Sequence, residues 1–305
     1  MPTWQTFPEH PTGELAERLR AINYVFSDAD GTMLTGAKAT VRSDGTPSAE
    51  LVQVLVELQQ AGVQVIPTSG RNRSMLFEDA RILGLPGWIA EMGGLLCTKQ
   101  GSQPEWCYFT GEMEYDPRSV RTPHDWICET GVIDEILERW PGDIETYHDN
   151  YVGFEYREVT VAMRGRVPDD EIQQVLDSFP LPLYVADNGY VSKMNGATTM
   201  TNVDMDHPEG VHTYHIMPRG LTKGTGIAEY MRLKGWAADE VLGAGDSPAD
   251  CEIANACGLF LFMSNGLKHP LAEEELARYD NVIVSRLPAT DGWVETMRAL
   301  LAAKE

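Results

Sequence analysis

The sequence predicts an α/β fold in which a doubly wound, Rossmann-like parallel sheet forms the core and a smaller α+β domain is inserted into it. Two observations lead to this prediction. Before residue 97 and again after residue 215, apolar strands alternate with amphipathic helices, which is the pattern of a parallel sheet covered on both faces. Between these parts, short runs of alternating polarity, rich in aromatic and charged residues, are typical of antiparallel strands.

The elements expected before residue 97 form an α/β unit. The helix at 46–62 illustrates the reasoning, because Pro47 suits the first helical turn, leucines 51, 55 and 58 form one stripe, and Gly62 suits the C-terminal cap. In chain order we expect a strand at 22–26, a helix at 46–62, a strand at 63–67, a helix at 74–86 and a strand with a turn at 87–96.

The same alternation returns near the end of the chain. There we expect, in order, a helix at 222–235, a strand at 240–245, a helix at 247–258 and strands at 259–266 and 281–285. In the middle, alternating runs at 158–165 and 181–194 predict strands, and 168–179 predicts a helix. We therefore expect a core formed by residues 1–96 and 216–305, with residues 97–215 as the inserted domain.

Charge and composition limit the class of protein. Asp and Glu outnumber Lys and Arg by 46 to 24, for a net charge of −22, which disfavours binding to nucleic acid or to an anionic membrane. No apolar run reaches the roughly 18 to 20 residues that span a bilayer, and residues 1–20 do not resemble a signal peptide. Five scattered cysteines are typical of free thiols in a reducing compartment, so we expect a cytoplasmic protein.

Polar clusters follow three of the predicted strands and precede one helix. Asp28 and Asp30 follow the first strand, Ser69 and Gly70 the second, and "GDSPAD", with Asp246 and Asp250, follows a third; Lys223 begins the helix at 222–235. In open α/β sheets, ligands bind beyond the carboxyl ends of the strands. We therefore expect these four clusters to meet in one polar site.

The residue types in these clusters indicate phosphoryl transfer. Several carboxylates together need a hard cation, and oxygen ligands favour Mg²⁺. The Ser69 hydroxyl, the Lys223 ammonium and the backbone N–H groups of Gly31 and Thr32 suit a phosphate. A carboxylate nucleophile beside a metal and a lysine describes transfer through an aspartyl-phosphate.

The four clusters resemble the motifs of the haloacid dehalogenase superfamily, in the same order. "DADGT" is similar to its D-x-D-G-T motif, Ser69 to its second-motif Ser/Thr, Lys223 to its third-motif Lys, and "GDSPAD" to its fourth motif. The resemblance covers about 180 residues of the core. The long insert resembles the C2B type of cap, found in Cof-type sugar-phosphate phosphatases and in sucrose-phosphate and mannosylglycerate-phosphate phosphatases.

The resemblance implies a role for each motif residue. Asp28 is implied to be the nucleophile and a metal ligand, and Asp30 the proton donor and later base, with its carbonyl oxygen on the metal. Ser69, Gly70 and Lys223 are implied to hold the phosphoryl group. Asp246 is implied to bind Mg²⁺, and Asp250 to bind it or to orient its waters.

The chain departs from the family pattern at two positions near the expected phosphate. Ala249 stands where the fourth motif usually has Asn, and Met92 in "AEMGG" stands where relatives often have Asn. The substrate-binding candidates are basic residues: Arg71, Arg157 and Lys193. A solvated helix start explains Arg71 equally well, and a polar strand edge or turn explains the other two equally well.

The expected function is a Mg²⁺-dependent phosphatase acting on a small phosphorylated metabolite, with a sugar phosphate as the favoured class. A phosphosugar mutase of the same fold and a non-catalytic sugar-phosphate sensor are the alternatives. The chain is expected to be a monomer or a homodimer. Two other patterns have simpler explanations: "DADGT" alone could be an acidic turn or a calcium loop, and the histidines at 207–215 could bind zinc, although an exposed acidic loop is favoured.

Overall fold

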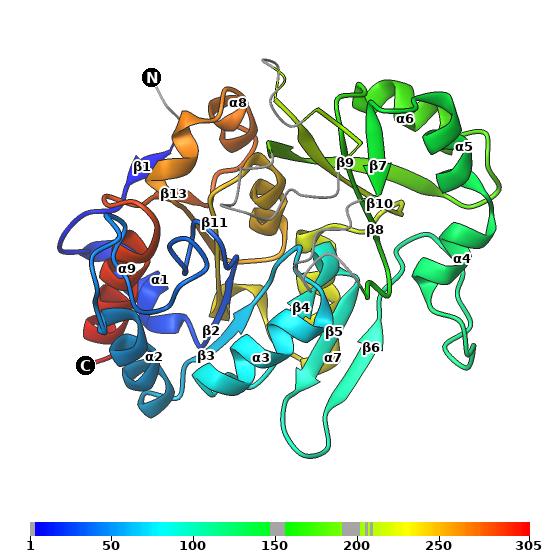
Figure 1. The fold of residues 1–305 in the computed structure, drawn as a ribbon. Helices are drawn as coiled ribbons and strands as arrows, with labels where there is room; N and C mark the ends of the chain where they lie inside the picture. The colour runs from blue at the N-terminus through cyan, green and yellow to red at the C-terminus, as the bar shows by residue number, and fades with distance from the viewer. Residues whose placement is uncertain (1–3, 147–155, 191–201, 205–206, 208–209) are drawn as a thin grey trace.

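The computed structural model describes residues 4–146, 156–190, 202–204, 207 and 210–305. Figure 1 shows a core with a central sheet and, beside it, a smaller part that carries its own sheet and helices. The predicted fold class is confirmed, because the core is a parallel sheet with helices on both faces and the insert is built on an antiparallel sheet. None of the helices in the described residues is long and apolar enough to cross a membrane.

The core sheet has six strands in the order β1-β13-β12-β11-β2-β3, and every neighbouring pair is parallel. The strands are β1 (Gln5–Thr6), β2 (Tyr24–Ser27), β3 (Gln64–Pro67), β11 (Val241–Gly245), β12 (Leu259–Phe262) and β13 (Val282–Val284). The strand order places β2 between β11 and β3. The carboxyl ends of three strands that carry polar clusters therefore lie side by side.

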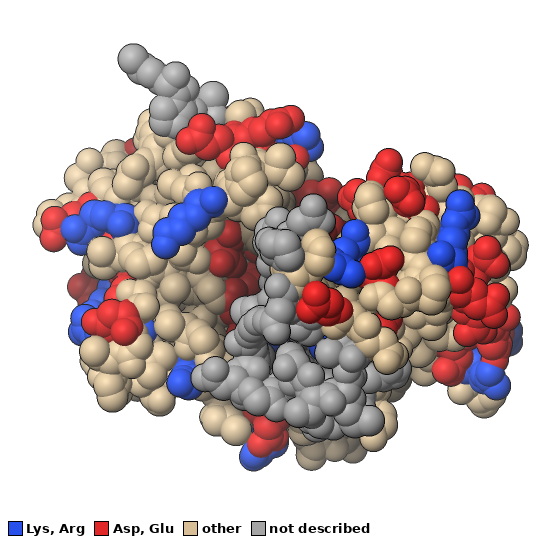
Figure 2. All heavy atoms as spheres, turned by 45° about the horizontal axis from the view of Figure 1, so that its top comes forward, with Lys and Arg blue, Asp and Glu red and all other residues tan. Residues whose placement is uncertain are grey.

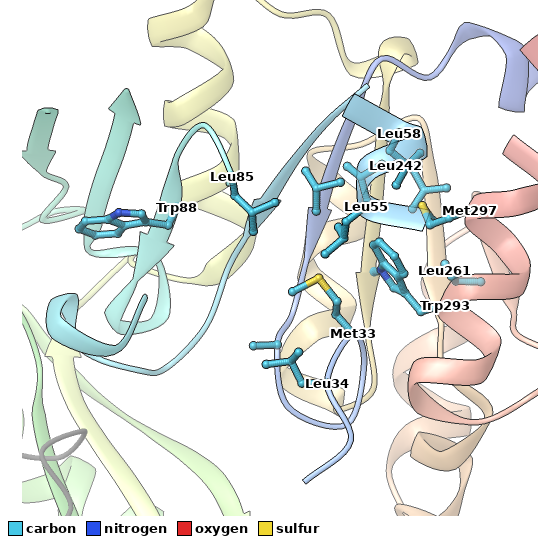
Figure 3. Packing of buried hydrophobic residues seen from close by; sticks show 14 of the residues in the cluster. Met33, Leu34, Leu55, Leu58, Leu85, Trp88, Leu242, Leu261, Trp293 and Met297 are labelled. Carbon is cyan, nitrogen blue, oxygen red and sulfur yellow. The ribbon is translucent and has the colours of Figure 1, made fainter. Parts of the chain in front are cut away.

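Two apolar layers cover the core sheet, because consecutive side chains of a strand point to opposite faces. Val25 joins the layer with α1 (Gly13–Ala21), α2 (Glu50–Gln60) and α9 (Ala289–Lys304). This layer is shown in Figure 3, where Leu55, Leu242 and Trp293 meet. Phe26 joins the opposite layer, with α7 (Lys223–Lys234), η3 (Pro248–Asn255) and α8 (Ala272–Leu276). The central strands are thus buried on both faces, whereas the two residues of the edge strand β1 are exposed.

A three-stranded antiparallel sheet extends the core next to β3. It consists of β4 (Trp88–Ala90), β5 (Leu95–Lys99) and β6 (Glu105–Tyr108), and a short 3₁₀ turn, η1 (Glu91–Gly93), connects the first two strands. Helix α3 (Arg73–Leu83) precedes it; the Asn72 side chain caps its start and Gly84, in the left-handed conformation, ends it. This arrangement places η1 close to the end of β3.

The inserted part is built on an antiparallel sheet with the order β7-β8-β10-β9. Its strands are β7 (Ile144–Thr146), β8 (Val161–Gly165), β9 (Leu183–Tyr190) and β10 (His212–Pro218). Helices α4 (Pro123–Glu129), α5 (Val132–Arg139) and α6 (Asp169–Leu176) share an apolar cluster with one face of this sheet. On the other face, Tyr184, Ala186 and Met217 pack with the core cluster.

The structure differs from the sequence predictions in several elements. Residues 248–255 form a 3₁₀ helix where an α-helix was expected, and α1, α4, α5 and α9 were not predicted. His212 and His215 lie in β10, so the interpretation of 204–215 as one exposed loop is wrong for these two residues. The expected domain limits, 97 and 215, fall within β5 and β10, and the division of the chain into 1–96 with 216–305 and 97–215 stays a prediction.

Candidate active site

The polar clusters converge at the carboxyl ends of β11, β2 and β3, as their order in the sheet requires. Asp28 follows β2, and its backbone N–H donates to the Ala244 carbonyl in β11 over 2.8 Å. Acidic side chains appear in the hollow between the core and the inserted part in Figure 2. Site residues from distant parts of the sequence are thereby brought together.

Lys223 joins two of the carboxylates. Its Nζ lies 2.7 Å from Asp28 Oδ1 and 2.6 Å from Asp250 Oδ1, and all three side chains are at most 8% exposed. Lys223 is the first residue of α7, whose start is fixed by a capping box between Thr222 and Thr225. The helix start therefore holds the ammonium group beside Asp28.

The second oxygen of Asp250 is also occupied. Asp250 Oδ2 accepts hydrogen bonds from the N–H groups of Asp246 and Ser247, at 3.1 and 3.0 Å, and from the Ser247 hydroxyl at 2.7 Å. Since both oxygens of Asp250 already accept hydrogen bonds, Asp250 is better placed to orient neighbouring groups than to bind a metal ion directly. This favours the second of the two roles that the resemblance implies for it.

Asp246 is held by two residues from other parts of the site. Its Oδ1 accepts a hydrogen bond from the Thr32 hydroxyl at 3.2 Å, and its Oδ2 accepts one from Asn265 Nδ2 at 2.9 Å. Gly31 lies against the same carboxylate with φ +81°, and a side chain at that position would collide with Asp246. The glycine of the first motif is thus required by both backbone conformation and space.

The two amides predicted to bind phosphate differ in their surroundings. The Gly31 N–H donates to the Leu34 carbonyl over 2.9 Å, whereas the Thr32 N–H has no backbone acceptor among the described residues. Phosphate binding by either amide stays a prediction. Of the two, Thr32 is the one whose N–H is available to a ligand.

Burial of several carboxylates together changes their pKa values. Burial raises the pKa of Asp28 well above its ordinary value, and the charges of Asp250 and Asp246 act in the same direction, although Lys223 partly offsets them. Burial and the Asp250 charge raise the pKa of Asp246 to about 7. Burial alone would lower the pKa of Lys223, but the Asp250 and Asp28 carboxylates outweigh it and raise this pKa.

The donor set fits a hard divalent cation. Asp28, Asp246 and Asp250 bring carboxylate oxygens within 4.8 Å of one another, and they are the one such group of three or more His, Cys, Asp or Glu side chains found in the described part of the chain. The set is made of oxygens alone, as Mg²⁺ prefers. A divalent cation would also relieve the repulsion that raises the pKa values of Asp28 and Asp246.

The raised pKa of Asp246 predicts that the metal-free protein loses stability as the pH rises. Between the ordinary value of 3.8 and the folded value of about 7, the folded state binds more protons than the unfolded state, so the free energy of unfolding falls with increasing pH. The contribution is complete below about pH 4 and is lost as the pH passes about 7. Thermal unfolding at pH 5 and pH 8 measures this difference.

A matched variant and the metal test this cause. Asp246→Asn should flatten the pH dependence, by up to about 1.4 kcal/mol for each pKa unit of the shift that is lost. Mg²⁺ should raise the melting temperature more at pH 8 than at pH 5, since it competes with protons for the site. An unchanged slope in the variant would mean that another group causes the pH dependence.

The second motif forms a loop at residues 69–71. Ser69 is buried, and its Oγ accepts a hydrogen bond from the Arg71 N–H at 3.3 Å. Arg71 binds both oxygens of Asp30, with Nε at 2.8 Å and Nη2 at 2.6 Å, and its Nη1 lies 2.6 Å from Asp79. Asp30 is half-exposed and Asp28 is buried, so the two aspartates of the first motif lie in different environments.

The substrate-binding candidates are placed differently from one another. Arg71 is engaged with Asp30, and Arg157 is a buried residue that contacts the loop after β3. Lys193 lies outside the described residues. Met92 lies against Gly70, where its sulfur would be 3.2 Å from an added Cβ, while Ala249 packs against the apolar core.

Sequence reasoning missed two residues that hold the site together. Asn265 follows β12, a fourth strand of the same sheet, and donates to both Asp246 and the Gly31 carbonyl. The polar "SNG" after an apolar strand was the available signal for it. Glu91, fully buried in η1, had no such signal, because its partners are backbone N–H groups of the inserted part.

Comparison with known proteins finds a family match that includes three residues of the site. Residues 207–272, which contain Lys223, Asp246 and Asp250, match the family of haloacid dehalogenase-like hydrolases. A curated protein of Methanoculleus marisnigri named phosphoglycolate phosphatase is 23% identical over 91% of this chain and 96% of its own length. A second, from Methanospirillum hungatei and with the same name, is 24% identical over 90% of this chain and 94% of its own length.

Solved structures show the same fold. The crystal structure of Thermoplasma acidophilum 0175 superposes with a TM-score of 0.60 at 16% identity, covering 92% of this chain and 98% of the other. The sucrose-phosphatase of Synechocystis superposes with a TM-score of 0.59 at 12% identity, covering 91% and 97%. Both curated relatives are phosphatases by name, and the carboxylate–lysine site on this fold is consistent with that class of enzyme. Over residues 207–272 the chain is thus similar to haloacid dehalogenase-like hydrolases, and its fold is the one that these solved structures share.

Proposed function

We propose that this phosphatase hydrolyses a small phosphorylated metabolite through an aspartyl-phosphate on Asp28, with Mg²⁺ as its cofactor. The observation that carries the proposal is the buried pairing of Lys223 with Asp28 and Asp250 at the carboxyl end of the sheet. A lysine in that position opposes the effect of burial by favouring the charged form of the carboxylate, and it offsets the charge of an incoming phosphoryl group. Both effects are required of an aspartate nucleophile.

The proposed reaction has two steps. Asp28 attacks phosphorus, the bond between phosphorus and the ester oxygen breaks, and Asp30 gives a proton to the leaving oxygen. Asp30 then takes a proton from water, whose oxygen attacks the phosphorus of the aspartyl-phosphate; the bond between phosphorus and the Asp28 oxygen breaks, which releases inorganic phosphate and restores the Asp28 carboxylate. Ser69 and Lys223 hold the phosphoryl oxygens. Asp28, Asp246 and the Asp30 carbonyl would hold Mg²⁺, which when bound supplies positive charge next to the phosphoryl group.

The Arg71 contact adds a condition to the first step. Arg71 donates to both oxygens of Asp30, the group that has to reach the leaving oxygen. We infer that this ion pair opens when substrate binds. The Nε and Nη2 groups of Arg71 would then be available to the substrate, while Nη1 stays with Asp79, which is consistent with the predicted role of Arg71.

The proposed substrate class is a small phosphate monoester, and a sugar phosphate is the first to be tested. The two curated relatives are named phosphoglycolate phosphatases, so a phosphorylated hydroxy acid belongs in the same test. The structural likeness to sucrose-phosphatase supports the fold alone at 12% identity. No feature of the described residues favours a mutase or a sensor over a phosphatase.

Release of inorganic phosphate tests the proposed function. The panel contains hexose phosphates, a disaccharide phosphate, 2-phosphoglycolate and p-nitrophenyl phosphate, each with Mg²⁺. We expect release from at least one natural ester at a higher kcat/KM than from the nitrophenyl ester. Isomerisation without release would indicate a mutase, and tight binding without turnover would indicate a sensor.

The role of Asp30 predicts a dependence on the leaving group. Asp30→Asn should slow the first step by about 10²- to 10⁴-fold on a sugar phosphate, since an alkoxide needs a proton to depart. On p-nitrophenyl phosphate the first step should be affected less, because nitrophenolate leaves without one. Single-turnover kinetics on both esters measure the difference, and equal losses in the first step would contradict the proton-donor role.

A further inference from the structure

We propose that Arg157, a residue of the inserted part, is a positioning residue for the loop at 69–71 and acts on the reaction through the Ser69 hydroxyl. This inference rests on the proposed function. It gives Arg157 a task other than reading the organic part of the substrate. The four observations that carry it are the fixed carbonyls of the loop, the orientation of one peptide group, the way Arg157 itself is held, and the backbone of η1.

All three carbonyl groups of the loop accept hydrogen bonds from outside it. Two donors are backbone N–H groups of η1, and the third is the guanidinium of Arg157. The bonds run from Met92 N–H to the Ser69 carbonyl (3.1 Å), from Arg157 Nη2 to the Gly70 carbonyl (2.9 Å) and from Glu91 N–H to the Arg71 carbonyl (2.9 Å). Arg157 thus supplies the one side-chain bond of the three, and it supplies the central one.

The central bond fixes the peptide group that positions the serine. The Gly70 carbonyl and the Arg71 N–H belong to one trans peptide, in which C=O and N–H point in opposite directions. When Arg157 holds the carbonyl, the N–H is directed to the other side, where it donates to Ser69 Oγ at 3.3 Å. The orientation of the hydroxyl that is proposed to bind a phosphoryl oxygen therefore depends on Arg157.

Arg157 is itself held tightly. Its Nη1 donates to Thr160 Oγ1 at 2.8 Å and lies 4.0 Å from Glu91 Oε2, and its side chain is 2% exposed. The Glu91 carboxylate accepts hydrogen bonds from the N–H groups of residues 158, 159 and 160, at 2.8, 2.9 and 2.9 Å. The segment that carries Arg157 is thereby fastened to η1, next to the loop that Arg157 supports.

Two energetically unfavourable features occur in this arrangement. Glu91 and Met92 have φ values of +51° and +60°, a left-handed backbone that is costly for residues other than glycine. Arg157 Nε is buried and has no hydrogen-bond partner among the described residues. Such local costs are typical of functional sites, and here both occur at residues that hold the loop.

The first test separates positioning from substrate recognition by kinetics. Arg157→Ala should lower kcat/KM by about 10- to 100-fold on both a sugar phosphate and p-nitrophenyl phosphate, because both present the same phosphoryl group to Ser69. Guanidinium ions should restore part of the activity of this variant. Arg118→Ala, which removes an 89% exposed arginine of the inserted part, is the control and should show neither effect.

The second test uses the dependence on Ser69. In a Ser69→Ala background, Arg157→Ala should cost less than about threefold, since the hydroxyl through which it acts is already gone. Thr160→Val, which removes the acceptor of Arg157 Nη1, serves if Arg157→Ala does not fold, and it should show the same pattern with a smaller loss. A loss confined to the sugar phosphate, or a full additional loss in the Ser69→Ala background, would overturn the proposal.

Amide hydrogen exchange tests the positioning without any turnover. Exchange of the Arg71 and Met92 amides should be about tenfold or more faster in Arg157→Ala than in the wild type, while Leu76 in α3 stays unchanged. If no ester is hydrolysed by the wild type but this exchange increases, the proposed function fails and the positioning role stands. If exchange at Arg71 and Met92 does not change, the positioning role fails whatever the activity.

Discussion

Asp28→Asn is expected to lower turnover by about 10⁴-fold or more and to leave no phospho-enzyme, because it removes the nucleophile and a metal ligand. The fold should persist. Burial raises the pKa of Asp28, which means that its charge is costly in the folded state, so a neutral amide of the same shape should not destabilise the metal-free protein. Phosphate release, trapping of the phospho-enzyme and thermal unfolding measure these expectations.

The control for this change is Asp280→Asn, which alters an exposed aspartate by the same chemistry. It should keep the activity of the wild type. Phosphate release by Asp28→Asn near the native rate would show that another group attacks phosphorus, and the assignment of the nucleophile would be wrong. Loss of the folded state in Asp28→Asn would contradict the electrostatic argument for its stability.

Removal of divalent metal is expected to abolish turnover. With excess EDTA, the three clustered carboxylates would repel an incoming phosphate more strongly than Lys223 attracts it, and Mg²⁺ should restore activity on addition. Ca²⁺ should inhibit, since its larger and looser coordination misplaces the nucleophile. Phosphate release from p-nitrophenyl phosphate, followed while Mg²⁺ is titrated back, measures the requirement, and full turnover in EDTA would contradict it.

The variant Asn265→Ala tests metal affinity without removing a proposed metal ligand. Its Nδ2 holds Asp246 Oδ2 and the Gly31 carbonyl, so Asn265→Ala should leave Asp246 less well oriented. The Mg²⁺ concentration for half-maximal activity is expected to rise by about 10- to 100-fold, as for other residues that support metal ligands. Activity at saturating Mg²⁺ should change much less. The reverse pattern would place Asn265 in the chemistry and not in metal binding.

The fold class and the members of the central cluster could be predicted from the sequence. Alternating apolar strands and amphipathic helices predict a parallel sheet, and such a sheet brings the carboxyl ends of its strands to one edge. The sequence therefore predicts that Asp28, Asp246 and Asp250 meet at this edge. Lys223 could be included because it begins the predicted helix after the inserted part, where the motif order of the haloacid dehalogenase superfamily places the third-motif lysine.

The partner of each polar side chain in the site, in contrast, is known only from the three-dimensional structure. Arg71 binds Asp30, which lies 41 positions away in the sequence, and Arg157 binds the Gly70 carbonyl, 87 positions away. Asn265 binds Asp246, 19 positions away. Periodicity and motifs describe neighbours along the chain and say nothing of such pairings. Helix α9 was missed for a related reason: its apolar face becomes evident only where Trp293 packs on the sheet.

The site therefore has features that can be read from the sequence and features that arise only from long-range packing. The residue types and their positions after strands can be read from the sequence, because ligands of a parallel sheet bind beyond the carboxyl ends of its strands. The orientation of the Ser69 hydroxyl follows from Arg157, which the chain brings back from the inserted part to the loop after β3. That long-range hydrogen bond forms only when the two parts pack together, so no local pattern could have predicted it.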